Sequence, residues 1–240
     1  MKLSLISLSI IILTLCVFIN SAVVVNKLDT ITNSSLVYSG LMPISDSSAD
    51  KLFFTFYSAK DAKTDADIPH FPLIVVVGSP GSSAQYHNLA GMGPLSLKPD
   101  MTTVSNPSSV TSFANVMFVD LLGNGFSFLA NTSNFPTKSE DYAKQLTYAL
   151  NALNKESNLG KSNVIVIVGE GTFLRSLPGF GDISGLTGLV HLSAWPELYA
   201  VSRYYGVAGI ELKIFTNAER VAIESTLVTC YNNVVNKKYP

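Results

Sequence analysis

The chain has 240 residues, of which 47% are hydrophobic and 14% are charged, with 16 Lys and Arg against 17 Asp and Glu. This length and apolar content suit one well-filled domain and do not require a second one. The net charge of -1 and the lack of a basic stripe with interleaved aromatic residues argue against a nucleic-acid partner. The low charged fraction favours an extracellular or lumenal protein over a cytosolic one.

Residues 1–22 predict a secretory signal peptide. Lys2 precedes an apolar run from Leu3 to Ile19, and small residues ending at Ala22 suit signal peptidase. A signal anchor is the alternative, because the run approaches the length of a membrane-spanning helix, although no basic stop-transfer cluster follows it. We expect cleavage, a mature domain over residues 23–240 without a membrane association, and a secreted or lumenal location such as the ER, the lysosome or vacuole, or the extracellular space.

The mature chain is expected to contain one cysteine, Cys230, because Cys16 lies in the signal peptide. In an oxidising compartment Cys230 either forms a disulfide with a partner chain or stays a buried thiol. Asn33 and Asn131 each begin an Asn-x-Ser triplet and are candidate glycosylation sites, as suits a secreted chain.

Apolar runs predict the strands in chain order. A short strand is expected among polar turns near residues 28–45, and an aromatic-rich strand at 51–59. Continuous apolar runs at 72–78, 115–120 and 163–169, and a weaker one at 187–193, are typical of strands covered on both faces.

Two helices are predicted between and after these strands. Thr137 and Glu140 are spaced as a capping box before an apolar helical face that reaches Leu153. Thr216 and Glu219 have the same spacing at the start of a helix over 216–230. The alternation of strands and helices indicates the α/β class, with a mostly parallel sheet flanked by helices.

Several stretches, in order, resemble the serine carboxypeptidase family. YSGLMPI (38–44) is similar to that family's YSGYLPV, and VVVGSPGSS (75–83) to its WLNGGPGCSS. ANVMFVDLLGNGFSF (114–128) is similar to ANVLFLDQPVGVGFSY, and VGEGTF (168–173) stands where GESYG is expected. The similarity covers nearly the whole mature chain and corresponds to about the N-terminal half of a family member. It implies a partial α/β-hydrolase fold.

The resemblance assigns a role to each matching position. Gly171 falls on the catalytic serine, so no nucleophile is expected there, and Glu170 on the acidic residue that helps bind the substrate's terminal carboxylate. Ser79 and Thr172 fall on the two residues whose N–H groups stabilise the oxyanion. Val77 stands where an asparagine would bind that carboxylate, and Ser82 where the family has a cysteine. The family's catalytic Asp and His lie in its C-terminal half, and we expect no counterpart of them here.

These losses predict a protein without peptidase activity that acts by binding a peptide, a protein partner or an active relative. An incomplete sheet would leave apolar surface uncovered and favour an oligomer. The alternative is an active hydrolase that releases C-terminal amino acids through another residue; Thr172 and Ser176 are the nearest hydroxyls. A third possibility is a truncated gene product without a role.

A relocated nucleophile would need a histidine within hydrogen-bonding reach. His87 is the histidine nearest to the candidate site in the sequence, whereas His70 precedes a strand and His191 lies in a short apolar run. We expect His87 to be a surface or helix-facing residue, because no motif places a carboxylate beside it. No His, Cys or Asp cluster has metal-ligand spacing, and no metal or cofactor is expected.

Overall fold

The structure is a computed structural model, and it describes residues 22–28, 35–169, 174, 177 and 183–191, with isolated positions 216, 218, 221, 225 and 229. The chain divides into two compact units, residues 1–191 and residues 192–240. Each unit is described by itself. The sequence predictions for Asn33, Glu170, Gly171, Thr172, Ser176 and Cys230 lie outside the described residues.

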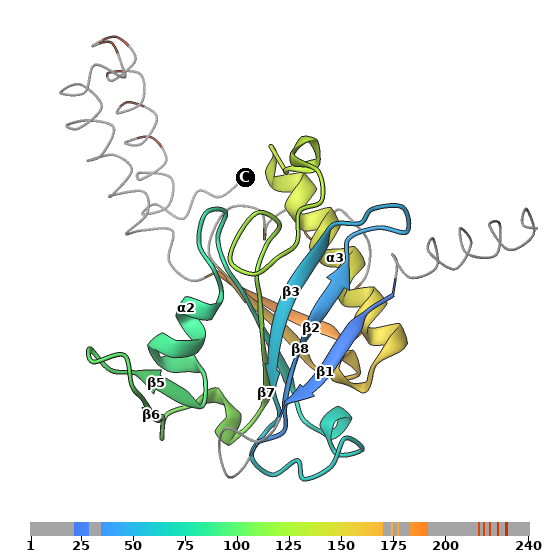
Figure 1. The fold of residues 1–240 in the computed structure, drawn as a ribbon, viewed down its shortest axis with the longest axis vertical. Coiled ribbons are helices and arrows are strands. Elements are labelled where there is room, and N and C mark those ends of the chain that lie inside the picture. Colours follow the sequence, from blue (N-terminus) through green and yellow to red (C-terminus); the bar gives the residue numbers. More distant parts are fainter. Residues whose placement is uncertain are drawn as a thin grey trace, which may run out of the picture. The chain divides into compact units, whose positions relative to one another are not determined.

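Seven strands of the first unit form one sheet, in the order β1-β2-β3-β7-β4-β8-β9 (Figure 1). Their bounds are Val24–Leu28 (β1), Val37–Pro43 (β2), Lys51–Tyr57 (β3), Leu73–Val77 (β4), Asn115–Val119 (β7), Ile165–Gly169 (β8) and Leu186–His191 (β9). The pairs β7–β4, β4–β8 and β8–β9 are parallel. The pairs β1–β2, β2–β3 and β3–β7 are antiparallel. The predicted α/β class and largely parallel sheet are confirmed.

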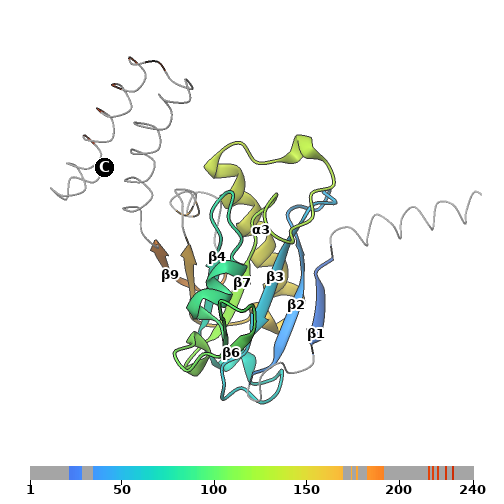
Figure 2. The same ribbon diagram turned by 60° about the vertical axis from the view of Figure 1, so that its left-hand side comes forward.

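The long helix α3 (Ser139–Glu156) covers one face of the sheet, and Figure 2 shows it behind β2 and β3. Its buried stripe includes Leu146, Leu150 and Leu153, which pack in one cluster with Val75 and other residues of that sheet face. The predicted apolar face is therefore confirmed. The predicted capping box is wrong: the helix begins at Ser139 after Lys138, which makes no side-chain capping hydrogen bond. A box with Thr137 as N-cap would have required the helix to start one residue earlier.

Short elements cover part of the other face. They are α2 (Gln85–His87), η2 (Asn88–Met92), the hairpin of β5 (Leu95–Leu97) and β6 (Thr103–Ser105), and η3 (Val110–Ser112). Ala84, next to α2, packs there with Val76 and Phe118 in a second buried cluster. Three further turns of 3-10 helix connect strands and helices: η1 (Ile68–His70), η4 (Thr132–Asn134) and η5 (Asn158–Gly160).

In the second unit, four of the described positions are helical: Ala218, Val221, Ser225 and Thr229. The Thr229 hydroxyl donates to the Ser225 carbonyl at 2.9 Å. A separation of four residues is typical of such bonds within a helix. These positions agree with the predicted helix over 216–230. Within the described parts of the chain, no helix combines the length and apolar character that a membrane crossing requires.

Candidate functional site

Three parallel strands end side by side at one edge of the sheet. Val77, the last residue of β4, pairs with Val119 at the end of β7 and with Gly169 at the end of β8. The loops that follow these strands therefore meet at the carboxyl edge, where open α/β sheets bind ligands. Gly169 directly precedes the predicted elbow at Glu170 and Gly171.

The loop after β4 begins with a glycine that the local packing requires. A Cβ on Gly78 would lie 2.3 Å from the Ser82 carbonyl oxygen and 2.8 Å from the Ala84 nitrogen, both backbone atoms. The loop then turns through Gly81, whose φ is +92°, and the Ser82 N–H donates to the Ser79 carbonyl at 2.9 Å. Gly78 therefore allows the loop to fold back onto the strand end.

Asp120, directly after β7, holds the far end of this loop. Its side chain is fully buried and accepts hydrogen bonds from the Ser83 hydroxyl at 2.7 Å and the Ala84 N–H at 2.8 Å. Its other oxygen accepts from the Phe126 N–H at 3.0 Å. A carboxylate with three such donors can stay buried without a cation, and it fixes the loop against β7.

Asn124 holds the near end of the loop through both ends of its amide. Its side-chain oxygen accepts from the Gly81 N–H at 3.0 Å, and its side-chain nitrogen donates to the Ser79 carbonyl at 2.9 Å. The Ser79 N–H itself meets no acceptor among the described residues. A rigid loop with an unused N–H is the arrangement that can bind an anion or a substrate carbonyl.

Val77 is apolar, whereas the family resemblance implies an asparagine at this position. It is fully buried in the cluster beneath α3 and offers no hydrogen-bonding group. Ser82 is half-buried within the turn.

An aromatic pair lies beside the loop. The rings of Phe53 and Phe126 are 5.2 Å apart at 60°, and Phe126 is 70% exposed. Because Asp120 accepts from both the Phe126 N–H and the Ala84 N–H, the backbone at Phe126 is tied to the same carboxylate as the loop. The exposed Phe126 ring provides an apolar surface next to the candidate site.

The three histidines belong to different elements. His87 ends α2, half-buried, with its ring 5.5 Å from Tyr86 in an edge-on arrangement. His70 is exposed before β4, at the opposite edge from the loop. The register places His191 beside Gly169, the residue before the predicted elbow, which sequence spacing alone did not indicate.

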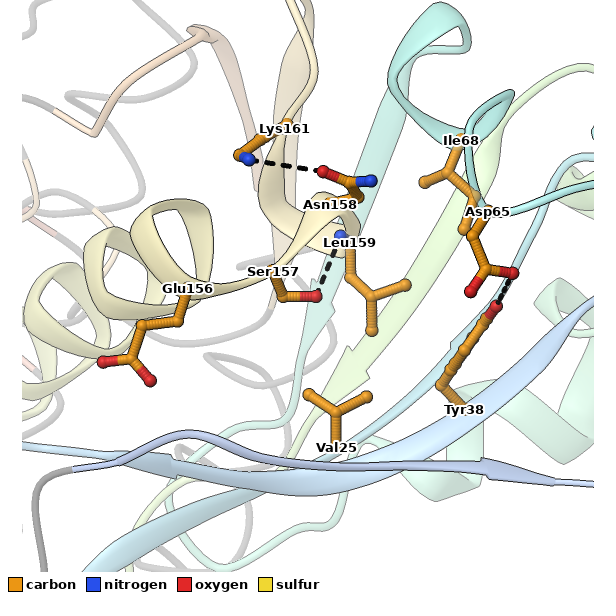
Figure 3. Close-up of a pocket in the computed structure, with 9 residues that line it drawn as sticks. All are labelled: Val25, Tyr38, Asp65, Ile68, Glu156, Ser157, Asn158, Leu159 and Lys161. Atoms are coloured by element: carbon orange, nitrogen blue, oxygen red, sulfur yellow. Dashed lines mark hydrogen bonds between the residues drawn. The ribbon is translucent and has the colours of Figure 1, made fainter.

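A cavity of about 330 Å³ lies at the amino edge of the sheet, away from the loop (Figure 3). Its Ile68 precedes β4 and its Lys161 precedes β8, which fixes that location. The Tyr38 hydroxyl donates to Asp65 at 2.6 Å, and burial together with this hydrogen bond raises the pKa of Tyr38 to about 12. Lys27 on β1 donates to the same carboxylate oxygen at 2.7 Å. These contacts join β1 and β2 to the loop before β4.

Within the described ranges, no group of three or more His, Cys, Asp or Glu side chains is placed to hold a metal ion. Asp120 and Asn124 were not among the site residues predicted from the sequence. A signal for Asp120 was present, because a carboxylate directly after a strand buried at every position lies at the carboxyl edge.

Comparison with known proteins gives a consistent result. The family model for serine carboxypeptidase matches residues 29–171. "Serine carboxypeptidase-like 50" of Arabidopsis thaliana is 27% identical over 146 residues, which are 60% of this chain and 32% of that protein. "Pheromone-processing carboxypeptidase kex1" of Schizosaccharomyces japonicus is 26% identical over 67% of this chain and 31% of its own length. The chain thus spans about a third of these relatives.

One solved structure shares the fold. The prohormone-processing carboxypeptidase Kex1(delta)p of Saccharomyces cerevisiae aligns with a TM-score of 0.57 and 22% identity, covering 86% of this chain and 49% of that one.

Proposed function

Since the chain belongs to the serine carboxypeptidase family, we propose that it is a secreted or lumenal member without peptidase activity, which binds peptides or a protein partner at the carboxyl edge of its sheet. The residue that carries the proposal is Gly171, which the resemblance of VGEGTF (168–173) to GESYG puts at the nucleophile position. A glycine has no side chain with which to attack a carbonyl carbon.

The loop after β4 supports a retained binding role. Asp120 and Asn124 hold this loop from β7 and the turn that follows it, and neither contact involves residue 171. The loop can therefore keep its shape without a nucleophile. Because the Ser79 N–H meets no acceptor in the described part of the chain and Phe126 is exposed beside the loop, we expect the loop to offer one polar and one apolar contact to an extended peptide.

Loss of catalysis is tested with the purified, full-length mature protein and a blocked dipeptide. We expect no release of the C-terminal amino acid, and no gain from Gly171→Ser, because a serine also needs a base and an orienting group. Turnover that Thr172→Ala or His87→Ala abolishes would overturn the proposal and identify the alternative, a hydrolase with another nucleophile.

One observation bears on that alternative. His191 is the register partner of Gly169, the residue that precedes the predicted elbow in the sequence. His191→Ala therefore belongs in the same assay: a loss of turnover in this variant would favour a working hydrolase, and an absence of turnover in the parent protein would exclude it.

Peptide binding is tested by calorimetry with a short peptide that ends in an apolar residue. Phe126→Ala should weaken binding about tenfold, which corresponds to about 1.4 kcal/mol. Phe113→Ala is the matched control, because Phe113 is also an exposed phenylalanine, at 62%, but precedes β7 at the other edge. Equal loss in both variants, or binding that neither affects, would contradict the proposed location.

The state of the terminal carboxylate provides a second test. Because Val77 cannot donate a hydrogen bond, we expect the peptide acid and the peptide amide to bind with similar affinity. A strong preference for the acid would show that a group other than the side chain of residue 77 binds the carboxylate.

A further inference from the structure

A polar cavity of about 640 Å³ lies between the β2–β3 connection, residues 133–137 and the first turns of α3. Its volume falls within the roughly 300–1,000 Å³ range of ligand pockets. Most of its lining residues carry hydroxyl, amide or charged groups: Ser45, Ser47, Ser48, Asp50, Ser133, Asn134, Thr137, Asp141, Lys144 and Gln145. Such a lining suits a ligand with many hydroxyl groups.

Asp50 fixes one wall of this cavity. The residue is fully buried, and its carboxylate accepts from the Ala130 N–H at 2.6 Å, the Asn134 side chain at 2.8 Å and the Ser48 hydroxyl at 2.7 Å. Two of these donors flank the segment 131–133. Asp50 thus holds the Asn131-Thr132-Ser133 triplet directly beside the cavity.

The side chain of Asn131 is arranged for modification. It is exposed, and its oxygen accepts from the Ser133 N–H at 3.0 Å, which turns the triplet into a tight loop. Among the described residues, nothing accepts a hydrogen bond from the Asn131 side-chain nitrogen, the atom to which an N-linked sugar is attached.

Two features of the wall fit a sugar. Phe135 is 45% exposed and lines the cavity, while a Cβ on Gly123 would lie 2.2 Å from its ring, so Gly123 supports the ring from one side. The ring face attracts the polarised C–H groups of a pyranose. The Gln145 side chain lines the same wall and carries an amide that can hydrogen bond to a sugar hydroxyl.

We propose that this cavity holds the first sugars of an N-linked glycan on Asn131, so that the glycan is a packed part of the domain. The proposal requires passage through the ER lumen, which the N-terminal segment predicts, and it is independent of any peptide binding. Attachment forms a bond between the Asn131 side-chain nitrogen and the anomeric carbon of a lipid-linked oligosaccharide donor. The bond from that carbon to the donor's diphosphate oxygen breaks, the lipid diphosphate leaves, and the amide nitrogen gives up one proton.

The test uses the full chain secreted from eukaryotic cells that leave oligomannose glycans. Glycopeptide mass spectrometry measures occupancy, and an endoglycosidase then removes glycans from folded and from denatured protein. We expect the Asn131 glycan to be released at least tenfold more slowly from the folded protein than from the denatured protein. An unoccupied Asn131, or equal release from both states, would overturn the proposal.

Two variants locate the protection in the cavity. Phe135→Ala removes the ring, and Ser47→Trp fills the cavity from an exposed position that the fold tolerates. Both should bring release at Asn131 in the folded protein close to the denatured rate, while Asn33→Gln should leave it unchanged. Protection that survives Ser47→Trp would place the glycan elsewhere and contradict the proposal.

Discussion

At the scale of single residues, the Asp120 carboxylate accepts three hydrogen bonds in the candidate site. Asp120→Ala would leave three donors, on Ser83, Ala84 and Phe126, without their acceptor, and we expect a loss of about 3 kcal/mol in the free energy of unfolding. Denaturant unfolding measures this loss. Asp61→Ala, at an exposed position, should change stability by less than about 0.5 kcal/mol. Equal effects in the two variants would show that the three hydrogen bonds of Asp120 do not contribute to stability.

Gly78 and Gly188 form a matched pair of glycines. A Cβ on Gly78 would collide with backbone atoms at 2.3 and 2.8 Å, whereas on Gly188 it would lie 3.9 Å from the Val166 side chain. We expect Gly78→Ala to destabilise the domain by about 2 kcal/mol through forced backbone shifts. Gly188→Ala should be neutral or stabilising by up to about 1 kcal/mol. Thermal unfolding of both variants checks the pair, and the reverse order would contradict the structure.

Asp50 predicts a specific pH dependence. Burial alone would raise the pKa of Asp50, but hydrogen bonds from Ser48, Asn134 and the backbone of Ala130 and Asn131 outweigh it and lower the pKa below 3.8. The resulting stabilisation is complete above pH 3.8 and is lost as the pH falls through the lower pKa of the folded state. The free energy of unfolding, measured as the pH falls below 3.8, should no longer show this loss in Asp50→Asn but should still show it in Asp61→Asn.

At the scale of elements, β1 is the solvent-exposed edge strand of the seven-stranded sheet. All five of its residues are exposed, and β2 is its only strand neighbour among the described residues, whereas every residue of β7 is buried. Hydrogen exchange of β1 amides should therefore be much faster than that of β4 and β7. Similar protection along all strands would mean that another surface covers β1.

The elements also show what sequence patterns can predict. The strands β3, β4, β7, β8 and β9 follow apolar runs long enough to be recognised, and the buried stripe of α3 has the helical period. β1 is short and solvent-exposed, and β5 and β6 have three residues each, so none of them carries a distinct pattern. The start of α3 at Ser139 was misplaced because a Thr-x-x-Glu spacing does not require a capping hydrogen bond.

The candidate site also has features that the sequence predicts and features that depend on the fold. Ser79 and the turn at 78–83 were predictable because glycine and proline mark the end of β4. The contacts made by Asp120 and Asn124 were not predictable, since they join residues 37 and 43 positions apart, respectively, and depend on how β4 and β7 pair. His191 came beside Gly169 through the register of β8 and β9, which sequence separation does not reveal.

At the scale of the whole molecule, the sheet supports the proposal of a partner. In the described part of the chain β9 pairs with β8 alone, and Leu189 and Val190 are 38% and 45% exposed. Such an edge favours association with another chain. We expect sedimentation at micromolar concentration to show an oligomer, or else binding of a hydrophobic dye. A monomer that binds no dye would contradict this expectation.

The intact, non-reduced mass of the protein from its native source addresses maturation and Cys230 together. A mass that matches residues 23–240 plus glycan would support removal of the leader and a free thiol. A larger mass that falls on reduction would identify a disulfide partner. A mass that includes residues 1–22 would contradict cleavage.

The way the loop after β4 is anchored separates two kinds of evolutionary constraint. The side chains of Asp120 and Asn124 hold the loop from a neighbouring segment of the chain. Selection for a stable fold therefore acts on these two residues whatever stands at position 171. Selection for turnover would act on the elbow instead. A protein anchored in this way can lose a nucleophile in a single substitution and still keep the fold of this loop, so later changes can act on the loop without first rebuilding the domain.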